Sequence, residues 1–195
     1  MVALTAEELA VQARTVLQLV KDPEVPVLSI VELGIVREVQ ADPDTGLVTV
    51  TITPTYSGCP AMKVIEDEIT GALGRAGFSK VKIETVYAPA WTTDWISEHA
   101  REKLRQFGIA PPGMVQLGGS AARGYPLGVG GSALPESADS PSVETSRRPD
   151  AEPSVKCPYC GSTETGLVSE FGPTACKALH VCRACRQPFE RFKTF

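Results

Sequence analysis

Apolar side chains recur at helical spacing near the start of the chain, and Thr5 with Glu8 forms the sequence pattern of a capping box. We expect this helix to lay its apolar face on a sheet and to end before the two prolines of residues 22–26. The next apolar segment, residues 27–33, predicts a short turn or helix that Gly34 closes. The apolar face of the first helix consists of Leu9, Ala13, Val16 and Val20.

The pattern then changes to the two-residue period of strands. Residues 35–40 and 47–52 are rich in apolar and β-branched side chains, and Gly46 lies in the turn between them where a positive φ is needed. Residues 81–87 alternate in the same way, which predicts a third, half-buried strand. A second helix is expected before that strand, with Gly77 at its end. Its apolar face consists of Met62, Ile65, Ile69, Leu73 and Ala76.

A last helix is expected with Asp94 as its N-cap and Gly108 at its end. The order helix, two strands, helix, strand, helix predicts a small α+β domain with one three-stranded sheet over residues 1–112. Residues 113–153 lose the pattern and are rich in Gly, Pro and Ser, so we expect a flexible linker there and a separate module at 154–195. The apolar face of the last helix consists of Ile96, Ala100, Leu104 and Phe107.

Two pairs of cysteines dominate the last module. Cys157 with Cys160 and Cys182 with Cys185 form two C-x2-C knuckles, and residues 161–181 between them have the length of two short strands. Four thiolates satisfy tetrahedral Zn²⁺ and leave no open position, so the spacing predicts a zinc ribbon with a structural metal. Because so short a module has little core, metal binding should supply much of its folding free energy.

Two further residues between the knuckles leave alternatives open. Cys176 could replace one ligand, react as a free thiol beside Lys177, or be a partly buried bystander, and the last is the favoured interpretation. His180 could also serve as a ligand, but four thiolates already suffice. His99 is expected at the surface of a helix rather than as a base. No nucleophile–base pair, phosphate-binding loop or carboxylate dyad is visible, so the residue pattern alone does not indicate an enzyme.

Charge narrows the classes of partner. The net charge of the 195-residue chain is −4, and residues 154–195 contain six basic and three acidic side chains. Four thiolates on Zn²⁺ would offset part of that small surplus, so we do not expect a nucleic-acid partner. No segment is long and apolar enough for a membrane helix, so we expect a cytoplasmic protein whose thiols stay reduced.

Cys59 lies between the second predicted strand and the second predicted helix. Ser57 and Gly58 suit a sharp turn, and Pro60 suits the first helical position because its missing N–H has no partner there anyway. Cys59 would then face unpaired N–H groups and the positive end of the helix dipole, which lower the pKa of a thiol. From the residues alone, the favoured interpretation is still a small buried side chain that fills the turn.

Seven motifs, taken together, resemble two related families. The motifs between residues 22 and 61 resemble the SufT-like family of iron–sulfur cluster assembly proteins. The later motifs narrow the resemblance to the PaaD (PaaJ) family, a subunit of the ring-1,2-phenylacetyl-CoA epoxidase, over residues 5–110 and 154–195. In chain order the motifs are Asp22-Pro-Glu-Val-Pro26, Glu32-Leu-Gly-Ile-Val36, Thr53-Pro-Thr-Tyr-Ser-Gly-Cys-Pro-Ala61, Pro89-Ala-Trp-Thr-Thr-Asp-Trp-Ile96, Lys156-Cys-Pro-Tyr-Cys-Gly161, Phe171-Gly-Pro-Thr-Ala-Cys-Lys-Ala-Leu179 and Pro188-Phe-Glu-Arg-Phe-Lys193.

The resemblance implies an accessory, non-catalytic subunit of phenylacetate catabolism. A di-iron oxygenase subunit and a flavin and [2Fe–2S] reductase are the implied partners, and this chain would help to install iron or an iron–sulfur cluster in one of them. Cys59 is the implied thiol for a transient iron or cluster, with Asp22 and Glu24 as acidic neighbours. This purpose makes a functional Cys59 the favoured interpretation. Trp91, Asp94 and Trp95 are interpreted as a core anchor and a helix cap.

Two other functions remain as alternatives. The chain could be a non-catalytic scaffold whose ribbon and linker tether the oxygenase to the reductase. It could instead be a nucleic-acid-binding ribbon protein, although an aromatic content of 6% gives little stacking surface.

Overall fold

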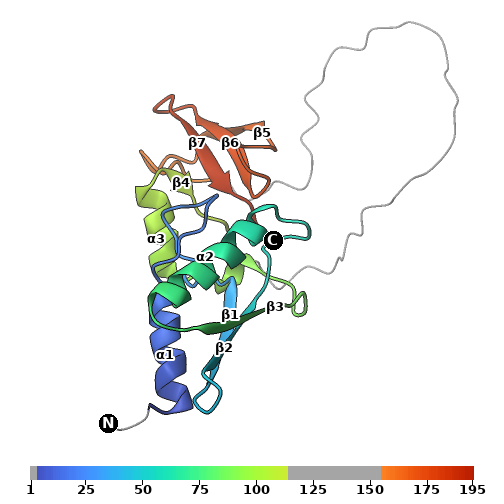
Figure 1. The fold of residues 1–195 in the computed structure, drawn as a ribbon. Coiled ribbons are helices and arrows are strands. Elements are labelled where there is room, and N and C mark those ends of the chain that lie inside the picture. Colours follow the sequence, from blue (N-terminus) through green and yellow to red (C-terminus); the bar gives the residue numbers. More distant parts are fainter. Residues whose placement is uncertain (1–3, 114–154) are drawn as a thin grey trace, which may run out of the picture. The chain divides into compact units, whose positions relative to one another are not determined.

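The computed structural model describes residues 4–113 and 155–195. These residues belong to one unit when the chain is divided by its internal contacts. Apart from residue 113, the expected linker lies outside the described residues. The described part has two sheets, one of three strands and one of four (Figure 1). The α+β class and the three-stranded sheet are therefore confirmed.

The first helix, α1 (Ala6–Leu17), begins at the expected capping box. The Thr5 hydroxyl accepts the Glu8 N–H at 3.2 Å, and a Glu8 carboxylate oxygen accepts the Thr5 N–H at 2.8 Å. Two of the free N–H groups at the start of the helix are thus satisfied. The helix buries Ala13 and Leu17 and packs on β1 and against α2.

The three-stranded sheet follows the predicted strands closely. The strands β1 (Val36–Asp42) and β2 (Leu47–Ile52) form an antiparallel hairpin, and β3 (Lys80–Thr85) pairs in parallel with β2. A parallel pair needs a crossover, and α2 (Ala61–Arg75) supplies it. Every second residue of β2 is buried, which matches one face turned to the core. The buried residues of this strand are Val48, Val50 and Ile52.

The expected cap of the last helix was wrong. Ser97, not Asp94, caps α3 (Glu98–Gln106), and its hydroxyl accepts the Ala100 N–H at 3.2 Å. Asp94 lies in a short 3-10 helix, η1 (Thr93–Trp95), and the extended backbone of Ile96 separates the two helices. Both residue types can cap a helix, so the backbone between them decides.

Two residues of the same region were expected in the core, and only one of them is buried. Trp91 is buried and donates its Nε1–H to the main-chain oxygen of Leu33 at 3.0 Å, so it is the expected anchor. Phe107 was expected on the apolar face of α3 but is the C-cap, with 57% of its surface exposed. His99 is exposed, as expected.

The second sheet joins the two described ranges of the chain. Its strands are β4 (Ile109–Ala110), β5 (Thr165–Ser169), β6 (Lys177–Cys182) and β7 (Pro188–Phe192), in the order β4-β7-β6-β5. The two strands expected between the knuckles are β5 and β6. The parallel pairing of β4 with β7 was not foreseen, and it extends the sheet of the ribbon with a strand from the first domain.

Apolar packing also joins the ribbon to the first domain. The Phe192 side chain from β7 is 1% exposed and belongs to the same core cluster as Leu33 and Ile35. Its ring lies 6.2 Å from that of Trp91. Burial of an aromatic side chain in this way stabilises by a few kcal/mol, about 1.5–3 for Phe. The ribbon is thus one wall of the main core and not an appended module.

Candidate functional site

Four ribbon sulfurs converge as the spacing predicts. The ligand atoms of Cys157, Cys160, Cys182 and Cys185 all lie within 4.8 Å of one another. The Sγ atoms of Cys157 and Cys185 are 3.7 Å apart, and those of Cys160 and Cys182 are 3.6 Å apart. Sulfurs at the corners of a tetrahedron with bonds of about 2.3 Å to Zn²⁺ are about 3.8 Å apart, so the group fits this ion.

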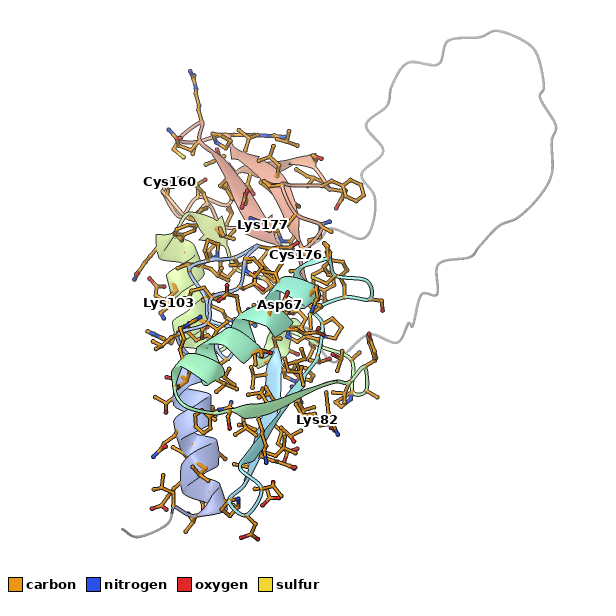
Figure 2. All side chains as sticks on the ribbon, viewed as in Figure 1. Asp67, Lys82, Lys103, Cys160, Cys176 and Lys177 are labelled. Carbon is orange, nitrogen blue, oxygen red and sulfur yellow. The ribbon has the colours of Figure 1, made fainter. Side chains whose placement is uncertain are left out.

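The two other ribbon residues that sequence spacing left open do not belong to that group. His180 is buried in β6 and stacks on Phe189 with ring centroids 5.7 Å apart. Cys176 lies just before β6 and is 3% exposed. Figure 2 shows Cys160 near one end of the ribbon and Cys176 with Lys177 near the other. Cys176 therefore has surroundings of its own.

Cys59 lies in the loop between β2 and α2, as predicted, but the helix begins one residue later than expected. Pro60 is the N-cap and Ala61 the first helical residue. The Cys59 N–H donates to the Tyr56 main-chain oxygen at 3.4 Å, and Gly58 between them has φ +80°. A positive φ suits glycine because a Cβ would be strained against the adjacent backbone in this conformation. This turn directs the Cys59 side chain toward the interior, where it is half-buried.

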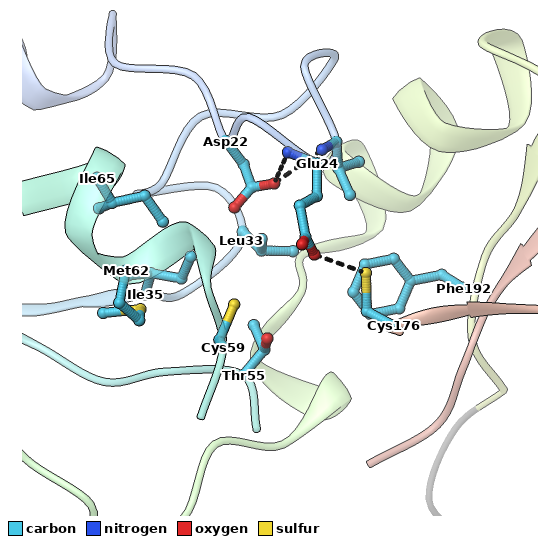
Figure 3. Close-up of a pocket in the computed structure, with 11 residues that line it drawn as sticks. Asp22, Glu24, Leu33, Ile35, Thr55, Cys59, Met62, Ile65, Cys176 and Phe192 are labelled. Atoms are coloured by element: carbon cyan, nitrogen blue, oxygen red, sulfur yellow. Dashed lines mark hydrogen bonds between the residues drawn. The ribbon is translucent and has the colours of Figure 1, made fainter. Parts of the chain in front are cut away.

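The three residues predicted from the resemblance lie around one cavity. Cys59, Asp22 and Glu24 line a space of about 10 Å³ beneath the N-terminus of α2 (Figure 3). This volume corresponds to about one water molecule. Cys176 from the ribbon lines the same cavity, and Thr55 adds a hydroxyl group. The remaining lining residues are apolar: Val25, Leu33, Ile35, Met62, Ile65 and Phe192.

Asp22 holds the loop that forms one side of the cavity. It is 5% exposed, and its Oδ1 accepts the N–H groups of Glu24 at 2.8 Å and Val25 at 2.7 Å. Burial raises the pKa of this carboxyl, against the lowering effect of the two N–H groups. Glu24 lies two residues further along the chain, and its Oε2 accepts the Cys176 S–H at 3.4 Å.

The expected lowering of the Cys59 pKa was wrong. Burial is the largest effect and raises the pKa of this thiol, and the Glu24 and Asp22 carboxylates raise it further. The N–H of Ala61 at the helix start does lower the pKa, but it does not outweigh the burial. The thiol is therefore protonated near neutral pH until a cation or another positive group replaces its proton.

Sequence reasoning missed Cys176 as a member of this site. Its pKa is raised to about 12, because burial disfavours the thiolate and Glu24 adds negative charge. The cysteine count was the available signal. The two knuckles use four of the six cysteines, and only Cys59 and Cys176 remain. Its position at the cavity depends on the docking of the ribbon, which no local pattern predicts.

Comparison with known proteins assigns the two parts of the chain. Residues 11–85 match the model of an iron-sulfur cluster assembly protein family, and residues 140–193 match that of the PaaD zinc beta ribbon domain. A protein of Escherichia coli (strain K12), named as a candidate component of 1,2-phenylacetyl-CoA epoxidase, is 41% identical over 174 residues. The alignment covers 89% of this chain and 86% of that protein. This chain belongs to the PaaD family.

Other relatives of this PaaD-family chain are shorter. The Fe-S protein maturation auxiliary factor YitW of Bacillus subtilis (strain 168) is 42% identical over 91 residues, which is 85% of its length and 45% of this chain. A solved DUF59 domain from Bacillus anthracis aligns with a TM-score of 0.48 and 28% identity, over 51% of this chain and 93% of that one. In the described part of the chain, no helix is long and apolar enough to cross a membrane.

Proposed function

We propose that this chain is an accessory subunit of a phenylacetyl-CoA epoxidase and delivers iron or an iron–sulfur cluster to its oxygenase or reductase component. The observation that carries the proposal is the shared cavity of Cys59, Asp22 and Glu24. Soft sulfur and hard carboxylate oxygen together suit iron as a cargo. The names of the E. coli and B. subtilis relatives support the partner and the cargo.

The cavity residues divide the work by their chemistry. Cys59 is the thiol that exchanges its proton for iron, and its loop position leaves it close to the surface for transfer to a client. Glu24 supplies an oxygen ligand, and Asp22 holds the Glu24 main chain in place through its N–H. The apolar lining limits the access of water to the metal–sulfur bonds.

The four-cysteine group has a different role in this proposal. It binds Zn²⁺ as a structural metal, because four sulfurs fill the coordination sphere and leave no position for cargo. Residues 1–112 then act as the assembly domain and residues 154–195 as the zinc ribbon. Free thiols of this kind work in a reducing compartment, so we place the activity in the cytoplasm.

The test is a Cys59→Ser variant in cells that grow on phenylacetate. We expect the variant chain to keep one zinc ion, while the iron and [2Fe–2S] content of the purified epoxidase components falls several-fold. Ser57→Ala is the matched control, since Ser57 is an exposed residue of the same loop. Full iron and cluster content in the Cys59→Ser strain would overturn the proposal.

A scaffold role is the second candidate, and the joining of the ribbon to the main core favours it. Removal of residues 154–195 would not test it, because the loss of Phe192 would open the core of the first domain. A scaffold instead predicts that Cys59→Ser is silent in the cell. Under that role, co-purification of oxygenase and reductase would depend on this chain but not on its cavity thiol.

A further inference from the structure

Cys176 is buried in the main hydrophobic core, but its sulfur contacts two polar groups. Its Sγ lies 3.4 Å from Oε2 of Glu24 and 3.1 Å from Oγ1 of Thr174. The neighbouring Lys177 donates its Nζ–H to the Glu24 main-chain oxygen at 3.3 Å and pairs with Glu190 at 2.7 Å. Two successive ribbon residues thus hold the side chain and the main chain of Glu24, and they fix the Cys176 sulfur at the cavity.

The cavity gathers acidic donors without a basic partner. Two thiols and two carboxyl groups line it, and among the described residues that line it none has a basic side chain. The Lys177 ammonium lies outside the lining, where the Glu24 main chain and Glu190 engage it, and its charge has only the smallest of the effects on the pKa of Asp22. A buried group of this composition is expected to be paired or to coordinate a metal. Burial disfavours the negatively charged forms of Asp22, Cys59 and Cys176 and raises their pKa, so a cation that displaces their protons would compensate the negative charge left behind.

We propose that Cys176 is a second thiolate ligand and that Cys59, Cys176 and Glu24 together hold a single Fe²⁺ ion. This inference rests on the proposed function and specifies its cargo as one divalent ion. A space of about 10 Å³ accepts one ion but not a cluster with two irons and two sulfides. Asp22 is a positioning residue, because its Oδ1 keeps the N–H groups of Glu24 and Val25.

Binding is an exchange of protons for a metal. Fe²⁺ enters, the two S–H protons leave to solvent, and two Fe–S bonds and one Fe–O bond form without a change in oxidation state. The S–H···O contact between Cys176 and Glu24 is the proton-bearing form of the same arrangement. Among the described residues only the ribbon cysteines form a group of ligand atoms within 4.8 Å of one another, so the ion has to draw the Cys59 sulfur inward.

Shorter relatives lack the part of the chain that supplies the second sulfur. YitW aligns over 85% of its length with only 45% of this chain, which leaves no room for a ribbon. Under this proposal, the ribbon converts an open one-thiol site into an enclosed site with two thiolates. A tighter hold on one iron is the expected gain.

Anaerobic titration of the zinc-loaded full chain with Co²⁺ tests the proposal. Thiolates give Co²⁺ intense near-ultraviolet charge-transfer bands whose strength follows the number of sulfurs bound. We expect the wild type to bind one additional Co²⁺ per chain. Cys176→Ser should show about half of the band per bound ion. Its affinity for the ion should fall by at least the roughly 10–100-fold that loss of an outer-shell partner costs. Ser57→Ala should match the wild type, and zinc at one ion per chain in every variant shows an intact ribbon. Fe²⁺ should compete for the same position.

Glu24→Gln gives an independent measurement if Cys176→Ser disturbs the fold. It keeps the shape of the side chain, so affinity should fall while the band per bound ion stays unchanged.

The proposal is overturned if the wild type takes up no additional ion, or if Cys176→Ser retains the full band. In those cases a Cys59-dependent loss of iron in the epoxidase would still support the proposed function. Uptake by both thiolates with normal epoxidase iron in Cys59→Ser cells would instead defeat the proposed function alone.

Discussion

Asp22 combines two duties that usually belong to different residues. Its Oδ1 satisfies two main-chain N–H groups of the loop, while the carboxyl group as a whole lines the cavity beside Cys59. The first duty needs only an oxygen acceptor, whereas the second needs a negative charge. Because burial raises its pKa, the charge of this side chain costs stability in the folded protein.

Asp22→Asn should separate the two duties. The amide oxygen still accepts both N–H groups, so we expect a free energy of unfolding close to that of the wild type at low pH. The folded pKa lies above the ordinary value of 3.8, so wild-type stability falls as pH rises from 3.8 through the folded pKa, relative to the variant. Urea unfolding at several pH values measures this difference. Parallel pH curves for both proteins would contradict it.

Matched Co²⁺ titrations complete the comparison at this residue. Asp22→Asn should weaken the additional site through its charge but leave the number of bound sulfurs unchanged. Asp22→Ala should also lose about 1–3 kcal/mol of stability, because the buried hydrogen bond from the Val25 N–H and the partly buried one from the Glu24 N–H are both lost.

Among the helices and strands, the sequence pattern predicts those features that depend on interactions between residues close together in the chain. The capping box of α1, the hairpin of β1 and β2, and the crossover helix α2 all rest on nearby residues, and all were predictable. The two-residue strand β4 has no pattern of its own, and its partner β7 belongs to the ribbon, far along the sequence. Such pairing depends on closure of a long loop, which sequence periodicity does not contain.

The same contrast applies to the cap of α3. Asp94 and Ser97 are both good N-cap residues, so residue type could not decide between them. The extended backbone at Ile96 decides, because it interrupts the helical path after η1.

Lys177 is the element-scale contact that we expect to matter most for docking of the ribbon. Its side chain is 8% exposed and bridges Glu190 of β7 and the main chain of Glu24. Lys177→Ala should lower the free energy of unfolding by about 1.5–3 kcal/mol, since hydrogen bonds to charged groups contribute this much. It should also increase hydrogen exchange at the Val25 N–H.

Lys63→Ala is the matched control for this change. Lys63 pairs with Asp67 on the surface of α2, with 76% and 66% of the two side chains exposed. Such fully exposed pairs contribute little to stability. Equal effects of the two lysine variants would show that the Lys177 contact does not hold the ribbon.

For the whole molecule, the site depends on packing between distant parts of the chain. Resemblance pointed to Cys59, Asp22 and Glu24, and the structure brings them to one cavity. The residue pattern treated Cys176 as a bystander, because nothing near it indicates that the ribbon covers the first domain. The sign of the Cys59 pKa shift was also out of reach, since the amount of burial comes from Phe192 and the surrounding core.

Removal of zinc should therefore affect more than the ribbon. A ribbon of about forty residues needs its metal to fold, so chelation should release β7 and uncover Phe192. We expect Cys59 and Cys176 to become open to alkylation and Trp91 fluorescence to change, since the Trp91 and Phe192 rings are 6.2 Å apart. Mass spectrometry of the alkylated chain locates the modified thiols. Labelling of the four ligand cysteines alone would show that the first domain keeps its own core.

The place of Cys176 in the chain has a consequence for biosynthesis. The ribosome synthesises the first domain well before the ribbon. At that stage the cavity at Cys59 still lacks the residues that the ribbon contributes. The ribbon can place Cys176 and Phe192 at the cavity only after it has bound zinc and folded. Zinc would then have to bind before iron. Protein purified from zinc-starved cells should therefore fail to retain iron even when iron is plentiful.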